Sequence, residues 1–86
     1  MSSLAIKSNH EFIATGVWFS EDRLHVALDD GREISVPLEF YPRLNSATKE
    51  QREKFELIGL GTGIHWSEID EDLSVQGIVF GIPARF

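Results

Sequence analysis

The feature that most constrains the fold is an Asp-Asp-Gly turn between two runs of alternating apolar and polar residues. Residues 24–28 and 34–38 each place an apolar side chain at every second position, as half-buried strands do. A three-residue loop, with Gly31 left-handed, pairs Val26 with Ile34 so that the apolar faces coincide, whereas a two-residue loop sets apolar residues opposite polar ones. We therefore predict an antiparallel hairpin with the three-residue loop.

Strand signals also flank this hairpin. Residues 12–20 are rich in β-branched and aromatic side chains and indicate a preceding strand. Either Trp18 or Phe19 would then lie opposite Leu24, and the sequence does not choose between them. Pro37 ends the third strand because proline cannot donate to a ladder.

The next segment predicts one main helix. Thr48 and Gln51 fit a capping box, and opposite charges recur four residues apart from residue 49 to residue 56. Phe55 lies on the apolar stripe, and Gly59 is a typical helix stop.

The remaining elements are short. Ile64-His65-Trp66 fits a fourth strand, and Ser74 fits the cap of a final helical turn that runs through Phe80. We predict an α+β fold in which a small antiparallel sheet of three to four strands, in β-β-β-α-β-α order, packs on one main helix.

Length and composition place the chain among small globular proteins. Its 86 residues predict a single domain, 1–86, with tails at 1–11 and 82–86. The absence of cysteine excludes disulfides and thiolate zinc sites. The N-terminal residues do not resemble a signal peptide, and no apolar run is long enough to span a membrane. We expect a cytoplasmic protein.

The net charge of −6 is unevenly distributed. Residues 1–40 carry three basic and seven acidic side chains, residues 41–58 carry four and three, and residues 59–86 carry one and four. Phosphate backbones are bound through clustered Lys and Arg, so we expect no direct nucleic-acid binding. The charge is compatible with a basic protein partner.

A glycine-rich to acidic segment contains the candidate functional residues. Three alternate glycines in Gly59–Gly63 lead into His65 and Trp66, and four acidic residues follow in segment 68–72. The glycine loop lacks the Lys-Ser/Thr of a phosphate loop, which argues against a nucleotide site. His65 has the chemistry of a metal ligand or a general base, but no nucleophile, thiolate or complete calcium loop accompanies it. A structural turn next to a helix N-terminus explains the same residues more simply.

Several segments together resemble a known family. The resemblance covers about residues 14–81, and its most specific part is Ile69-Asp70-Glu71-Asp72-Leu73-Ser74-Val75. The other matching segments are Val17-Trp18-Phe19, Leu28-Asp29-Asp30-Gly31-Arg32, Val36-Pro37-Leu38, Tyr41-Pro42-Arg43-Leu44, Ala47-Thr48-Lys49-Glu50-Gln51-Arg52-Glu53 and Ile64-His65-Trp66. They resemble the bacterial "domain of unknown function 2442" family.

This resemblance implies a compact α+β domain with a small antiparallel sheet and no assigned catalytic residues. Some relatives carry the domain ahead of a helix-turn-helix segment, and some are encoded beside small proteins in toxin–antitoxin-like pairs. Both associations imply an interaction or regulatory module. We expect no room for a helix-turn-helix extension in this chain, so the resemblance does not imply DNA binding in its own right.

We therefore predict a small non-enzymatic module without catalytic residues, metal or cofactor. It would act as a homodimer or as an antitoxin-like acidic partner of a basic protein. The alternative is a small-ligand or metal-binding domain centred on His65 and the acidic segment 68–72. We expect Trp66 to be at least partly buried, and Asp70 and Asp72 to stay exposed and accept hydrogen bonds near Ser74. The candidate partner or ligand surface comprises His65, Trp66, Asp70, Asp72, Tyr41 and Arg43.

Overall fold

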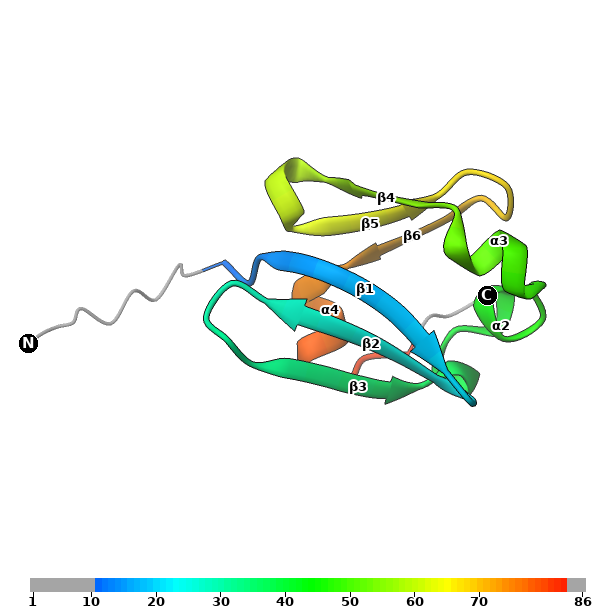
Figure 1. Cartoon of the computed structure of the whole chain (residues 1–86), viewed down its shortest axis with the longest axis horizontal. Helices are drawn as coiled ribbons and strands as arrows, with labels where there is room; N and C mark the ends of the chain where they lie inside the picture. The colour runs from blue at the N-terminus through cyan, green and yellow to red at the C-terminus, as the bar shows by residue number, and fades with distance from the viewer. Residues whose placement is uncertain (1–10, 84–86) are drawn as a thin grey trace, which may run out of the picture.

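The computed structural model describes residues 11–83 as an α+β fold of two three-stranded antiparallel sheets and several short helices. The strand orders are β1-β2-β3 and β4-β5-β6, and Figure 1 shows α2 and α3 together at one end of the sheets. Predictions for residues 1–10 and 84–86, which include most of the tails, lie outside the described residues. The elements are β1 (Ala14–Ser20), β2 (Arg23–Leu28), β3 (Glu33–Pro37), the 3-10 turn η1 (Leu38–Phe40), α2 (Pro42–Asn45), α3 (Lys49–Glu53), β4 (Phe55–Ile58), the 3-10 turn η2 (Gly59–Gly61), β5 (Gly63–Trp66), β6 (Glu71–Ser74) and α4 (Val75–Val79).

The register predicted for the β2–β3 hairpin is confirmed. Val26 lies opposite Ile34, and the Leu28 N–H donates to the Arg32 carbonyl at 2.8 Å, which closes the three-residue loop. Gly31 has a φ of +95°, the left-handed conformation that this loop requires.

The structure also decides the register of the first hairpin. Phe19, not Trp18, lies opposite Leu24, so Phe19 faces inward and Trp18 outward. A bulge between Ala14 and Gly16 shifts the alternation by one residue, which returns Ala14 to the buried side.

The main helix predicted from Thr48 towards Gly59 is wrong in length. Its capping box is present, because the Gln51 N–H donates to Thr48 Oγ1 at 3.1 Å and the Thr48 N–H donates to Gln51 Oε1 at 2.9 Å. The helix nevertheless ends at Glu53, and Phe55–Ile58 forms strand β4. No residue of α3 is buried, so this helix has no apolar face to extend, whereas pairing with β5 gives the strand-forming side chains of β4 a partner.

The strand predicted at residues 64–66 is confirmed as β5, but it is the centre of a second sheet. The single sheet of three to four strands is therefore corrected to two sheets of three. The acidic segment contributes strand β6 to this sheet, where a turn before a helix was predicted. Ser74 caps α4 as predicted, since the Gly77 N–H donates to its Oγ at 2.9 Å.

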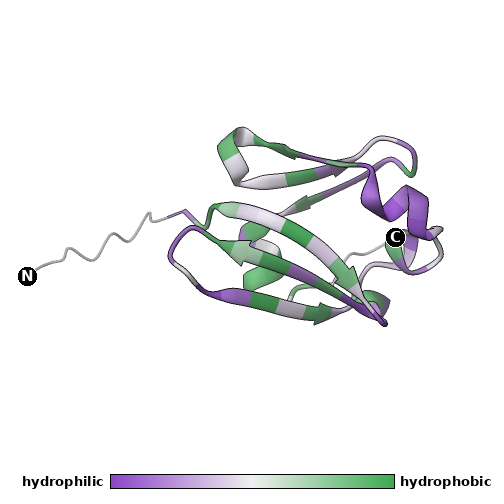
Figure 2. Cartoon of the chain, viewed as in Figure 1, coloured by the Kyte–Doolittle hydropathy of each residue, from purple (hydrophilic) through white to green (hydrophobic). Residues whose placement is uncertain are grey.

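One core lies between the two sheets. Leu24 and Val26 from β2, Ile64 and Trp66 from β5, and Ile78 from α4 are all buried in it. Figure 2 shows the matching pattern of alternating hydropathy along the strands, whereas α3 is hydrophilic throughout. Within residues 11–83, no helix is long and apolar enough to cross a membrane.

The first prediction concerns the two tryptophans. Trp66 is 0% exposed and Trp18 is 38% exposed. We expect Trp66→Ala to lower the free energy of unfolding by about 3–5 kcal/mol, the usual cost of emptying a buried aromatic site. Trp18→Ala is the matched control and should cost about 1 kcal/mol, because it removes mainly a stack on His25. Chemical denaturation measures both, and equal losses would contradict the assignment of Trp66 to the core.

Candidate functional site

A row of three charged or titratable side chains crosses the outer face of the second sheet. His65 lies between Glu56 on β4 and Asp72 on β6, as directly opposed residues of neighbouring strands. Because Ile64 and Trp66 point into the core, the alternation of the strand turns His65 outward. We call Glu56, His65 and Asp72 the outer row.

His65 and Asp72 are joined by a hydrogen bond between the imidazole Nδ1 and a carboxylate oxygen. This bond raises the pKa of His65 above 6.5, partial desolvation opposes the rise, and the nearby charges of Asp72, Glu56 and Asp70 add to it. The outer row can therefore hold a proton at the acidic end of the physiological range. The expected bonds from backbone N–H groups near Ser74 to Asp72 are replaced by this contact.

The turn between β5 and β6 is held from both sides by basic residues. Arg43 Nη1 donates to the Asp70 carbonyl at 2.6 Å, and Lys54 Nζ forms an ion pair with Glu68 at 2.8 Å. Asp70 is exposed, as predicted, and has a φ of +54°. Its backbone oxygen, rather than its carboxylate, makes the described contact, so Asp70 helps to shape the turn.

Two residues of the candidate surface lie in the core, which confirms the expected burial of Trp66. Trp66 is fully buried and donates its indole N–H to the Arg52 carbonyl at 2.9 Å. Tyr41 is 1% exposed. Neither side chain can present a contact surface to a partner, because both pack inside this small domain as aromatic core residues usually do.

The sequence reasoning missed Glu71 as a buried acid. Glu71 lies opposite Trp66 on the inner face of the sheet and is 5% exposed. Its Oε2 and the Tyr41 hydroxyl are buried without a hydrogen-bond partner. Desolvation raises the pKa of Glu71, with Arg43 opposing the rise, while burial and the charge of Glu71 raise the pKa of Tyr41 to about 12. The missed signal is alternation: once Asp72 points outward in a strand, Glu71 must point inward.

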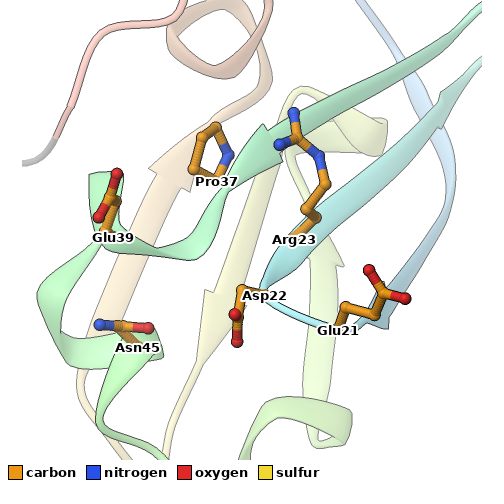
Figure 3. A pocket seen from close by; sticks show the side chains of 6 residues that line it. All are labelled: Glu21, Asp22, Arg23, Pro37, Glu39 and Asn45. Atoms are coloured by element: carbon orange, nitrogen blue, oxygen red, sulfur yellow. The ribbon is translucent and has the colours of Figure 1, made fainter.

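A depression in the surface lies at the other sheet. It measures about 570 Å³ and sits between the β1–β2 turn and the η1–α2 segment. Figure 3 shows the carboxylates of Glu21 and Asp22 on one side of the depression, and the Glu39 carboxylate and the Asn45 side chain on the other. Arg23 also lines this depression, but its single positive charge is outnumbered by the carboxylates of Glu21, Asp22 and Glu39. The depression is therefore open and negative on balance, and it does not enclose a ligand.

His65 does not line this depression or any of the three smaller ones on the described surface. Tyr41 and Asp72 do share one hollow, of about 250 Å³, beside β6 and α4. Within residues 11–83, no three His, Asp or Glu side chains gather in a way that could hold a metal ion. The six predicted surface residues thus fall into three groups: the outward His65 and Asp72, the turn residue Asp70 with Arg43 of α2 bound to its carbonyl, and the buried Tyr41 and Trp66.

This arrangement belongs to a class of small α+β domains in which two short sheets share one core. A family model described as "Protein of unknown function (DUF2442)" matches residues 14–84, and the chain belongs to this family. The resemblance noted in the sequence is thereby confirmed.

Two solved structures share the fold. A protein of unknown function from Rhodospirillum rubrum superposes with a TM-score of 0.77 at 29% identity, over 88% of this chain and 94% of that one. An uncharacterized protein from Chromobacterium violaceum superposes with a TM-score of 0.71 at 21% identity, over 85% of this chain and 69% of that one. No curated protein matches the chain.

The second prediction concerns the buried Glu71. Its folded pKa lies above its ordinary value of 4.5, so the folded state keeps the proton to a higher pH than the unfolded chain does. The resulting stability is fully present below pH 4.5 and is lost as the pH rises through the folded pKa. Glu71→Gln keeps the shape and cannot ionise. We expect this variant to be more stable than the natural chain at pH 8 and equally stable at pH 4, as measured by urea denaturation at each pH. A Gln variant that is less stable at pH 8 would show that the carboxylate is stabilised by its charged neighbours.

The third prediction concerns the outer row. Asp72→Asn should lower the pKa of His65, because it replaces the anionic acceptor by a neutral one. Nuclear magnetic resonance titration of the His65 imidazole in the natural chain and in the variant measures this directly. An unaltered His65 titration would contradict the bond to Asp72.

Proposed function

We propose that the chain is a non-enzymatic bacterial interaction module, antitoxin-like or regulatory, that binds a basic surface of another cytoplasmic protein. The observation that carries the proposal is the outer row, in which Glu56 and Asp72 are exposed on both sides of His65. Acidic side chains on the solvent side of a sheet provide a surface complementary to Lys and Arg.

The charge balance of the described residues supports this proposal. Residues 11–83 hold all 14 acidic residues but six of the eight basic ones, a formal net charge of −8. Five of these basic side chains make contacts inside the domain, including Arg23 with Ser35 and Arg32 with Asp30. Arg43 binds the Asp70 carbonyl, Arg52 binds carbonyls at the end of α2, and Lys54 pairs with Glu68. A field of this sign speeds encounter with a basic partner and disfavours association with a second acidic copy.

A second candidate function has one specific observation in its favour. The bond from Asp72 orients the His65 imidazole as it would in a general base. However, Ser74, the hydroxyl on the same face of β6, already accepts the capping bond of α4, and His65 lies outside the four depressions described above. A reaction needs a substrate held next to the base, so the geometry favours binding over catalysis. The metal-binding alternative has less support, because the described residues provide no triple of suitable ligands.

The fourth prediction tests the interaction proposal. The tagged chain should capture a basic protein, with the product of the adjacent gene as the first to be assayed. Glu56→Lys should weaken that capture by about tenfold, and added salt should weaken it further. Glu33→Lys, the same reversal at an exposed residue of β3 in the first sheet, is the matched control and should bind nearly normally.

Two results would contradict the proposal. Capture that is indifferent to both salt and Glu56→Lys would show that charge does not direct the interaction. A chemical turnover that His65→Ala abolishes, in a variant that remains folded, would establish the catalytic alternative instead.

A further inference from the structure

Strand β4 has an outer edge that no described strand covers. It pairs with β5 on one side only, and Figure 1 shows it at the border of the second sheet. An uncovered edge presents backbone N–H and C=O groups that can pair with another chain, and natural proteins usually blunt such edges.

Two other sheet edges of the described chain carry such protection. β1 has a bulge at Ala14–Gly16, and β3 ends in Pro37. β4, with the sequence Phe-Glu-Leu-Ile, has no proline, glycine, lysine or bulge. Its apolar residues distinguish it from the acidic edge strand β6, which has the sequence Glu-Asp-Leu-Ser.

Apolar side chains gather along this unprotected edge. Leu57 is 38% exposed, Ile58 is 42% exposed, and Leu60 in the following turn is 95% exposed. Leu57 shares the inner face of the sheet with Ile64, while Ile58 shares the outer face with the outer row. Apolar contact area is thus available on both faces and at the end of the strand.

The turn that holds Leu60 is strained and well anchored. Leu60 has a φ of +59° between two glycines that also have positive φ, a conformation that L-residues other than Gly, Asn and Asp seldom adopt. Gly61 lies so close to β1 that an added Cβ would come within 2.8 Å of the Ala14 carbonyl oxygen. The Val75 N–H also binds the Thr62 carbonyl at 2.9 Å. The fold therefore holds an exposed leucine in a fixed place, at a conformational cost that glycine at position 60 would avoid.

The charge around β4 indicates what could pair with it. Glu56 projects from the middle of β4 on the outer face, next to His65 and Asp72. A strand added to β4 would set its own outward side chains beside Glu56 and its inward ones beside Leu57. A second copy of this chain would bring another net charge of −6, which opposes self-pairing. Basic residues on the outward side and apolar residues on the inward side would complement this edge.

We propose that the free edge of β4, with Leu60 at its end, accepts an extended segment of the basic partner as an added β-strand. This inference rests on the proposed function, and it specifies that the partner segment alternates basic and apolar residues. Backbone pairing supplies affinity in this mode, and the alternating side chains supply specificity.

The probe is the peptide acetyl-Thr-Lys-Val-Lys-Val-Lys-Thr-amide, N-methylated at its lysine amides so that only one of its edges can pair. Added to the isotope-labelled full chain, it should shift the amide resonances of Phe55–Ile58 and slow their hydrogen exchange. The same peptide with Glu in place of Lys is the charge control and should not bind. Resonance shifts confined to other elements, equal binding of the two peptides, or no binding at millimolar peptide would overturn the proposal.

Leu60→Asn is the decisive variant, because asparagine tolerates positive φ and the fold should therefore persist. It should weaken peptide binding by about tenfold. Ile82→Asn removes another exposed apolar side chain, far along the chain from β4, and should leave binding unchanged.

Glu56→Lys and Leu60→Asn together separate this inference from the proposed function. Suppose that Glu56→Lys abolishes capture of the basic protein, that Leu60→Asn leaves capture unchanged, and that the hydrogen exchange of the β4 amides does not slow on binding. The edge inference is then wrong and the interaction module stands. If sedimentation reveals a dimer that Leu60→Asn disrupts, the edge pairs with a second copy of this chain and not with a basic partner.

Discussion

The structure depends on the burial of one indole. Trp66 lies between the sheets, where its ring approaches Phe19 of β1 and Phe55 of β4. Its N–H binds the Arg52 carbonyl, and the Arg52 side chain in turn binds carbonyls of Leu44 and Asn45 at the end of α2. A single residue thus links both sheets to the helical segment. In a domain of this size few other side chains bury as much apolar area, so the position of β5 follows largely from this contact.

The parts of the fold that the sequence predicts correctly are those governed by local chemistry. The β2–β3 register follows from Gly31 and a period of two, and the caps at Thr48 and Ser74 follow from side chains that bind nearby backbone. Strands β4 and β6 were missed because their pairing partners are decided by the tertiary structure and not by a local turn signal. Phe55–Ile58 fits a helical stripe as well as a strand, and contact with β5 decides between them.

The distinction between local chemistry and tertiary contacts also explains which parts of the candidate site could be predicted. Sequence proximity brings His65, Trp66, Asp70 and Asp72 together, but strand alternation sends neighbours to opposite faces. His65 and Asp72 therefore meet outside, whereas Trp66 and Glu71 meet inside. The raised pKa of Glu71 follows from its inward position beside the buried Tyr41 hydroxyl, which no pattern in the acidic segment reveals by itself.

Charge and edge exposure are connected through the short helices. Arg43, Arg52 and Lys54 hold the β5–β6 turn and cap α2, so the contacts that these three cations make are with groups other than the outer row. This use of basic side chains fixes the turn that follows β5 and so aligns β6 with β5. The negative face lies directly beside the open edge of β4, and the same three strands define both features. A basic strand at that edge would extend the sheet and neutralise its face together, which a contact on either feature alone would not achieve.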